Sequence, residues 1–269
     1  MLKLPVLLLL LCYKSESGKT TKKAPWPRQV TPKLRIHHAQ DAETAAYPFI
    51  AMLITIPEPK TSFLRQCTSS IITKNYALTA AHCLTIRSAP PLYVWHGSHA
   101  VSPLETGSYT AVTEYFPHPT SRGPLAEGPS FRTFLNDVGL VRFNDVTLPR
   151  YGILSAVDYL TMIGLPVKYV GGGRTSKPDD DQKRALQVGE GAILSCPSEF
   201  KKTSSIIICV VPKCVSSLSP VAQGDSGGPL LENGKIIGVV ATSISHNSSN
   251  VCTPVSPYLD WIYSILNSI

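Results

Sequence analysis

Residues 224–229 read Gly-Asp-Ser-Gly-Gly-Pro, which places Ser226 between glycines. Far upstream, residues 79–83 read Thr-Ala-Ala-His-Cys, with His82 next to a cysteine. A serine in a glycine turn can act as an exposed nucleophile, and a nearby histidine can act as its base. Between the two lies Asp137, at the head of the apolar run Val-Gly-Leu-Val. The three side chains are candidates for one Ser-His-Asp set, in the chain order His, Asp, Ser.

Each of these residues also has an ordinary structural explanation. His82 could be a packed core histidine, Asp137 a charge at the edge of a strand, and Ser226 one more residue in a glycine turn. The joint occurrence of three flanking motifs in this order favours nucleophilic catalysis over three separate coincidences.

Taken together, the motifs resemble those of the trypsin and chymotrypsin family of serine endopeptidases, from about Ile36 to the C-terminus. The resemblance implies an all-β fold of two antiparallel six-stranded β-barrels with a C-terminal helix, the first barrel ending near residue 150. It also implies His82 as general base, Asp137 as its orienting carboxylate, Ser226 as nucleophile, and the N–H groups of Gly224 and Ser226 as the oxyanion hole.

Short apolar runs between turn residues recur along the chain, as in an all-β architecture. They predict strands at residues 49–56, 70–78, 92–95, 138–143, 167–170, 185–194, 206–211 and 236–241. The end of the chain differs, because Leu259, Ile262, Ile265 and Ile269 recur at helical spacing. This spacing predicts a terminal amphipathic helix.

Length and composition suit a secreted globular protein. The chain has 269 residues, 43% of them hydrophobic, which suffices for a sizeable core. Residues 1–18 contain a short charged end and a leucine run, which predict a signal peptide too short to be a membrane anchor. Residues 19–35, rich in Lys, Thr and Pro, predict a propeptide before the protease domain at 36–269. We expect a secreted monomer without a membrane anchor.

The net positive charge of the chain comes from residues 1–35. Residues 1–35 carry six Lys and two Arg against one Glu, whereas residues 36–269 hold 17 basic and 17 acidic residues. Nucleic-acid binding would rest on a solvated tail without a folded scaffold, and no nucleic-acid motif accompanies the charge. We therefore expect no nucleic-acid partner. The residues on which it would depend are Lys19, Lys22, Lys23, Arg28 and Lys33.

Six cysteines remain once Cys12 is removed with the signal peptide, and an oxidising compartment favours three disulfides. The resemblance implies the pairs Cys67 with Cys83 and Cys196 with Cys209. Cys214 and Cys252 are left, and a bridge between them would tie the pocket loops together, although sequence alone does not fix the pairing. The cysteines lack zinc-site spacing, and no acidic loop has calcium-ligand spacing. We expect no metal and no cofactor.

The resemblance further implies activation by cleavage after Arg35. Ile36 stands eleven residues before Tyr47, the spacing of the family's mature N-terminus, although His37 follows where the family has an aliphatic residue. The new Ile36 amine would then pair with the Asp225 carboxylate. A zymogen of this kind needs an upstream trypsin-like activating protease.

The expected specificity pocket departs from that of trypsin. Pro220 stands where trypsin-like members place the aspartate that captures Lys or Arg, so we expect no cleavage after basic residues. The remaining pocket positions predict a shallow site for small or medium apolar side chains. They are Ala241, Thr242, Ser243 and Asn250. Asn247 opens the only Asn-x-Ser/Thr sequon, and both a glycan and an unmodified loop remain open there.

A peptidase of this kind would cleave proteins or peptides and would be a target for a protein inhibitor. Two other functions compete with this interpretation. A weakly active or non-catalytic homologue that acts as a binding or regulatory protein is favoured by the altered pocket and N-terminus, and disfavoured by the intact triad. A lipase or esterase fits the pattern Gly-x-Ser-x-Gly at 224–228, but the chain order and the absence of alternating helices argue against it.

Overall fold

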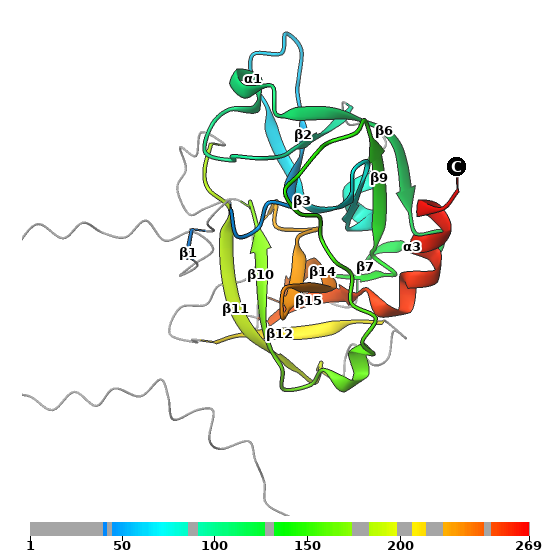
Figure 1. Cartoon of the computed structure of the whole chain (residues 1–269). Coiled ribbons are helices and arrows are strands. Elements are labelled where there is room, and N and C mark those ends of the chain that lie inside the picture. Colours follow the sequence, from blue (N-terminus) through cyan, green and yellow to red (C-terminus); the bar gives the residue numbers. More distant parts are fainter. Residues whose placement is uncertain are drawn as a thin grey trace, which may run out of the picture. The chain divides into compact units, whose positions relative to one another are not determined.

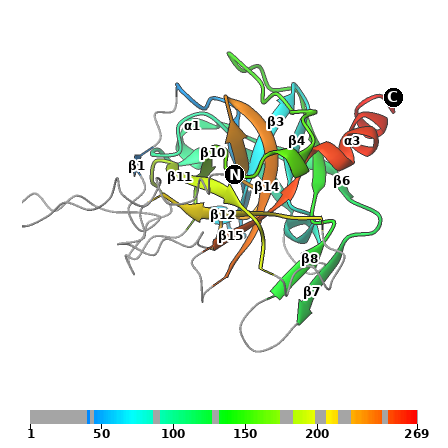
Figure 2. The same ribbon diagram turned by 90° about the horizontal axis from the view of Figure 1, so that it is seen from below.

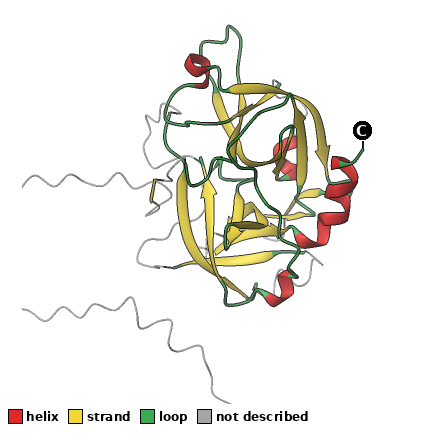
Figure 3. Cartoon of the chain, in the orientation of Figure 1, coloured by secondary structure: helices red, strands yellow, loops and turns green. Residues whose placement is uncertain are grey.

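Strands make up most of the regular secondary structure of the described residues, and the helices are short (Figure 3). The computed structural model describes residues 40–41, 45–85, 91–126, 132–173, 183–197, 206–213, 223–244 and 249–268. All of them belong to a single unit, residues 34–269.

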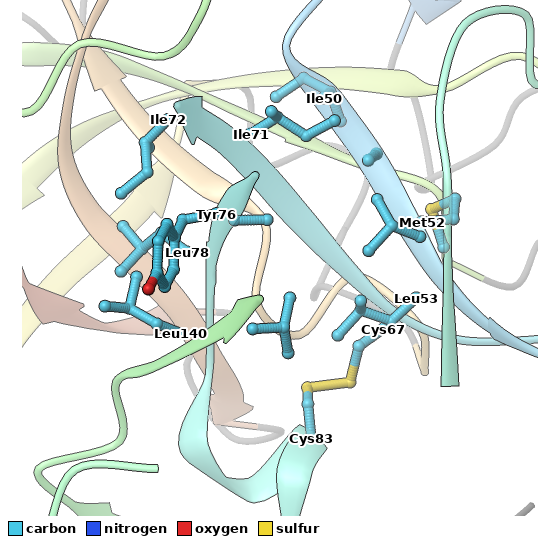
Figure 4. Close-up of a cluster of buried hydrophobic side chains, with 14 of the residues drawn as sticks. Ile50, Met52, Leu53, Cys67, Ile71, Ile72, Tyr76, Leu78, Cys83 and Leu140 are labelled. Carbon is cyan, nitrogen blue, oxygen red and sulfur yellow. A yellow bond between two sulfur atoms is a disulfide. The ribbon is translucent and has the colours of Figure 1, made fainter. Parts of the chain in front are cut away.

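The first half forms a closed antiparallel barrel in the order β2-β3-β4-β9-β6-β5. Its strands are β2 (Ile50–Thr55), β3 (Leu64–Thr73), β4 (Tyr76–Thr79), β5 (Leu92–Trp95), β6 (Tyr109–Pro117) and β9 (Gly139–Phe143). Every residue of β2 is buried, and all but the last, Thr55, are apolar. Figure 4 shows part of this interior, where Leu78 lies beside Leu140 and the Cys67–Cys83 disulfide belongs to the same buried cluster.

The second half forms another antiparallel ring, in the order β11-β10-β13-β14-β15-β12, which a pairing between β11 and β12 closes. Its strands are β10 (Pro166–Gly171), β11 (Gln187–Leu194), β12 (Ile208–Pro212), β13 (Pro229–Glu232), β14 (Lys235–Ile244) and β15 (Ser249–Pro254). The short β1 (Gln40–Asp41) adds to β11. Two six-stranded barrels are thus present within the described residues, which confirms the predicted fold class (Figure 1).

The predicted C-terminal helix is α3 (Leu259–Leu266), which begins after the 3-10 turn η4 (Ser256–Tyr258). Ile262 is fully buried whereas Tyr263 is half exposed, so one face of the helix packs against the barrels. The other short helices are η2 (Ala81–Leu84), α1 (Pro103–Thr106) and η3 (Tyr159–Thr161). None of the described helices has the length and apolar character needed to cross a membrane.

The strand predicted at residues 70–78 is wrong, because a turn divides it between β3 and β4. The hydroxyl of Thr73 accepts hydrogen bonds from the backbone N–H groups of Asn75 and Tyr76. This local side-chain bonding reverses the chain at Lys74 and Asn75, so the apolar run is a hairpin rather than one strand.

A two-stranded hairpin, β7 (Arg122–Ala126) and β8 (Arg132–Leu135), projects beside the barrels (Figure 2). It precedes Asp137 in the sequence, and β8 lies close to β14 of the second barrel. No apolar run marked it in the sequence.

Two of the three expected disulfides are present, Cys67–Cys83 and Cys196–Cys209. The expected bridge between Cys214 and Cys252 is contradicted, because Cys252 is a free thiol. Cys252 lies on β15 with its side chain in the apolar core of the second barrel, which raises the pKa of the thiol to about 12. A side chain that points into a barrel core cannot tie surface loops together, and Cys214 itself lies outside the described residues.

Candidate active site

His82 and Asp137 are held together by two hydrogen bonds. Nδ1 of the His82 ring lies 2.7 Å from Oδ2 of Asp137, and the backbone N–H of His82 donates to Oδ1 at 2.8 Å. Only 1% of the Asp137 side chain is exposed, against 23% for His82. The carboxylate therefore fixes both the ring and the backbone of His82, while the ring keeps some access to solvent.

Covalent and local backbone features set this geometry. His82 lies in η2, directly after β4, and its neighbour Cys83 is tied to Cys67 on β3. On the other side, Asn136 adopts a left-handed conformation with φ of 47°. Its side-chain oxygen accepts from the Tyr258 hydroxyl at 2.7 Å. The turn that presents Asp137 is thus braced by the segment leading into α3.

The loop that carries Ser226 is anchored to both barrels. The Ser226 carbonyl accepts from the N–H of Thr68 on β3 at 2.8 Å, and Gly227 N–H donates to Val240 on β14 at 2.8 Å. Gly227 has φ of 84°, and a Cβ there would come within 2.2 Å of the Thr68 carbonyl. Only glycine fits this close approach, which accounts for the glycine after the serine.

In this structure Ser226 is in a resting conformation. Its hydroxyl lies 3.4 Å from the Ala241 carbonyl on β14, and it makes no hydrogen bond with His82. The Nε2 atom of His82 instead faces Cys83 Sγ at 3.8 Å. Transfer of a proton to His82 requires the Ser226 hydroxyl and His82 Nε2 to come within hydrogen-bond reach, an adjustment that often accompanies substrate binding.

The expected oxyanion donors lie in this same loop. Gly224 adopts φ of 100°, a conformation suited to glycine. Within the described part of the chain, neither the N–H of Gly224 nor that of Ser226 donates to another residue. Both groups are thus available to a negatively charged oxygen.

Asp225 is buried, with 2% of its surface exposed, and its Oδ1 accepts from the N–H of Gly173 at 2.7 Å. A Cβ on Gly171 or Gly173 would approach the carboxylate to 2.2 or 2.5 Å. The glycines at 171 and 173 therefore make room for this side chain, a signal that the sequence alone did not reveal. Arg35 and Ile36, the other two activation residues, lie outside the described residues.

Phe134, on β8, stacks on the His82 ring with centroids 4.6 Å apart and planes 25° from parallel. Phe134 was not predicted from the sequence, because it belongs to no motif and its contact with His82 joins two segments far apart in the chain. Stacking of this kind holds one face of the imidazole and leaves less of it open to water.

The expected pocket residues are only partly described. Ala241 is buried, and Asn250 is 1% exposed and hydrogen-bonds with Tyr169 from β10. The Asn250 side chain therefore lies in the interior, below the surface that a substrate would contact. Thr242 and Ser243 lie on β14, where they pair with Val251 and Asn250. Pro220 and Asn247 lie outside the described residues.

Two other groupings are not candidate sites. The Cys67, His82 and Cys83 ligand atoms lie within 4.8 Å of one another, but the disulfide leaves neither sulfur free to bind a metal. An open cavity of about 480 Å³ lies on the second barrel, and none of the candidate catalytic residues lines it.

A buried arginine links the two barrels close to this site. The guanidinium of Arg65, on β3, donates to the carbonyls of Gly172, His99 and Arg184 at 3.1, 2.8 and 2.8 Å. It lies over the Trp95 ring, 4.8 Å from the centroid. Gly172 directly precedes the residue whose N–H binds Asp225. Arg65 therefore supports the backbone next to the loop that carries Ser226.

His99 packs against this arginine and is 2% exposed. Its Nε2 bonds with the Trp95 carbonyl at 3.1 Å, while Nδ1 has no partner among the described residues. Burial, and then the charge of Arg65, lowers the pKa of His99 to about 3. The ring is therefore neutral in the folded protein.

This histidine should make the folded state sensitive to acid. Because folding depresses the pKa of His99, the folded state binds fewer protons than the unfolded state between about pH 6.5 and 3. The contribution of the neutral ring to the free energy of unfolding is therefore complete above about pH 6.5 and is lost as the pH falls toward 3. The free energy of unfolding should fall by about 1.4 kcal/mol per pH unit from this group alone. A His99→Gln variant has no titrating group at this position and lacks this loss of stability in acid. In urea titrations, the difference in free energy of unfolding between the variant and the wild type should therefore narrow between pH 6.5 and 4. A difference that stays constant across this range would contradict the prediction.

Comparison with known proteins adds to these observations. A family model described as Trypsin matches residues 36–262. A chymotrypsin of Phaedon cochleariae is 26% identical over 87% of this chain and 83% of its own length. Trypsin alpha of Drosophila melanogaster is 30% identical over 76% and 78%, and human Kallikrein-9 is 31% identical over 75% and 81%. With the two barrels and these matches in place, the chain belongs to the trypsin family of serine proteases.

Proposed function

We propose that the protein is a secreted serine endopeptidase made as a zymogen, which hydrolyses peptide bonds through an acyl-enzyme on Ser226. The observation that carries the proposal is the 2.7 Å contact between His82 and the buried carboxylate of Asp137. A buried carboxylate on Nδ1 is the arrangement that holds a general-base histidine in the correct tautomer and stabilises the imidazolium in Ser-His-Asp enzymes. Family membership supports the reaction class, and residues 1–18 support secretion.

The proposed mechanism begins when the Ser226 hydroxyl attacks the substrate carbonyl and passes its proton to His82 Nε2. Asp137 stabilises the imidazolium that results. The negative oxygen of the tetrahedral intermediate takes hydrogen bonds from the N–H groups of Gly224 and Ser226. His82 then gives its proton to the leaving amine, and water attacking the acyl-enzyme releases the second product and restores Ser226.

Activation would place the new amine of Ile36 against the carboxylate of Asp225. Asp225 is buried beside Ser226, so a change in its partner acts directly on the backbone that carries the nucleophile. A buried ion pair of this kind acts as a switch rather than as a source of stability. Because the proposed pocket rejects arginine, the cut after Arg35 would be made by another, trypsin-like protease.

Specificity for small or medium apolar side chains is supported by the absence of a carboxylate at position 220.

A peptide-library assay tests activation and specificity together. The full chain, treated with immobilised trypsin to cut after Arg35, should cleave after small or medium apolar residues, whereas an Arg35→Ala variant given the same treatment should be at least about 100-fold less active. A dominant preference for Lys or Arg would overturn the specificity, and full activity of the Arg35→Ala variant would overturn the zymogen mechanism.

One observation favours the second candidate, a non-catalytic homologue that binds a partner. The Ser226 hydroxyl bonds with the Ala241 carbonyl instead of His82. If this conformation persists after cleavage, no proton transfer occurs and the library assay gives no product with any residue.

A further inference from the structure

Thr68, on β3 of the first barrel, is completely buried and joins three separate segments of the chain. Its hydroxyl donates to the Gly224 carbonyl at 2.7 Å and accepts from the Gly172 N–H at 3.1 Å. Its own backbone N–H donates to the Ser226 carbonyl at 2.8 Å. The Thr68 side chain therefore connects the first barrel to the end of β10 and to the loop that carries Ser226.

The bond to Gly224 bears on the proposed oxyanion hole. Gly224 has φ of 100°, so its two flanking peptide planes are joined by a residue with little resistance to rotation. The plane on its carboxyl side is fixed through the carbonyl by Thr68, and the plane on its amino side carries the N–H that would meet the oxyanion. An anchor on one side of a glycine restricts the directions open to the other side.

The alternative partner of the hydroxyl is weaker. Met52 Sδ lies 3.6 Å from Thr68 Oγ1, whereas the Gly224 oxygen lies at 2.7 Å and is the stronger acceptor. The single hydroxyl proton is therefore directed at Gly224.

We propose that Thr68 is a positioning residue for the oxyanion hole, acting through the Gly224 carbonyl. The inference rests on the proposed function, because it assigns Thr68 a part in that reaction. Thr68 differs from residues that only stabilise the barrel, because its hydroxyl bonds with the Gly224 carbonyl. That carbonyl belongs to the peptide next to the one that carries the proposed catalytic N–H.

The test uses the rate at which a fluorophosphonate labels Ser226 in the full chain after cleavage behind Arg35. The phosphoryl oxygen of the probe occupies the oxyanion position, so the rate reports on those donors without knowledge of the natural substrate. Thr68→Val keeps the shape and removes the hydroxyl, and labelling should slow about tenfold. Thr68→Ser restores the hydroxyl and should label within about threefold of the wild type.

Ser69→Ala is the matched control, because Ser69 is equally buried on the same strand and its hydroxyl donates to Ala51 inside the first barrel at 3.2 Å. It should lose stability but label at the wild-type rate. If Thr68→Val does not fold, Thr68→Ala takes its place.

The inference is overturned if Thr68→Val labels as fast as the wild type, if Thr68→Ser is as slow as Thr68→Val, or if Ser69→Ala slows labelling to the same degree. In those cases the proposed function stands. A cleaved wild-type chain that does not react with the probe overturns both.

Discussion

Replacing Ser226 or His82 by alanine should lower the kcat of the cleaved protein by about 10⁶, and replacing both should lower it no further. In the proposed mechanism the two residues act in one step, since the hydroxyl is a nucleophile only while the imidazole can take its proton. Asp137→Asn should cost about 10⁴, because an amide in the place of the carboxylate favours the wrong tautomer of His82. These magnitudes are typical of Ser-His-Asp proteases in general. The 2.7 Å contact between His82 and Asp137 is the observation in this chain that supports applying them here.

Ser264→Ala is a suitable control for these variants. Ser264 lies exposed on α3, and its hydroxyl bonds only with the Trp261 carbonyl of the same helix among the described residues. Its replacement should leave kcat unchanged. Single variants whose losses multiply in the double variant would show that Ser226 and His82 act independently, contrary to the proposed mechanism.

Replacing Arg65 by methionine should lower the free energy of unfolding by about 3–5 kcal/mol. The change removes charged hydrogen bonds to three carbonyls in the interior and the contact with the Trp95 ring. A loss of this size is a large share of the 5–15 kcal/mol that stabilises a typical domain. Activity should fall as well, because the Gly172 backbone beside Asp225 loses its support.

Arg142→Met is the matched control in chemical denaturation. Arg142 also lies over an aromatic ring, Tyr76, at 6.0 Å, but 40% of its side chain is exposed and its partner is Glu114. Exposed ion pairs contribute about 0–1 kcal/mol, so this variant should be nearly as stable as the wild type. Equal losses in the two variants would contradict the structural role assigned to Arg65.

The all-β class followed from the sequence because its signals are local and repeated, whereas the arrangement in two six-stranded barrels was implied by the family resemblance of the motifs. Short apolar runs marked strands such as β5 and β9, and helical spacing marked α3, whose Ile262 is buried as expected. β6 was missed because it runs along the surface, with only Val112 buried, so its sequence shows no apolar run. The strand prediction at 70–78 failed because Thr73 closes a turn by its own hydroxyl, which an apolar pattern does not reveal.

The candidate site was predictable only as far as motifs extend. His82, Asp137 and Ser226 lie in recognisable flanking sequences, whereas Thr68, Arg65 and Phe134 act through contacts between segments far apart in the chain. Cys252 was assigned to a bridge by elimination, and its place inside the second barrel could not be read from cysteine counting. The catalytic and pocket roles stay predictions until they are measured.

The catalytic role of Ser226 is tested most directly by the site of fluorophosphonate labelling in the full chain after cleavage behind Arg35, read by mass spectrometry of the digested protein. We expect one stoichiometric label on Ser226, which a His82→Ala substitution abolishes. A cleaved, folded protein that takes up no label, or that is labelled equally without His82, would contradict it.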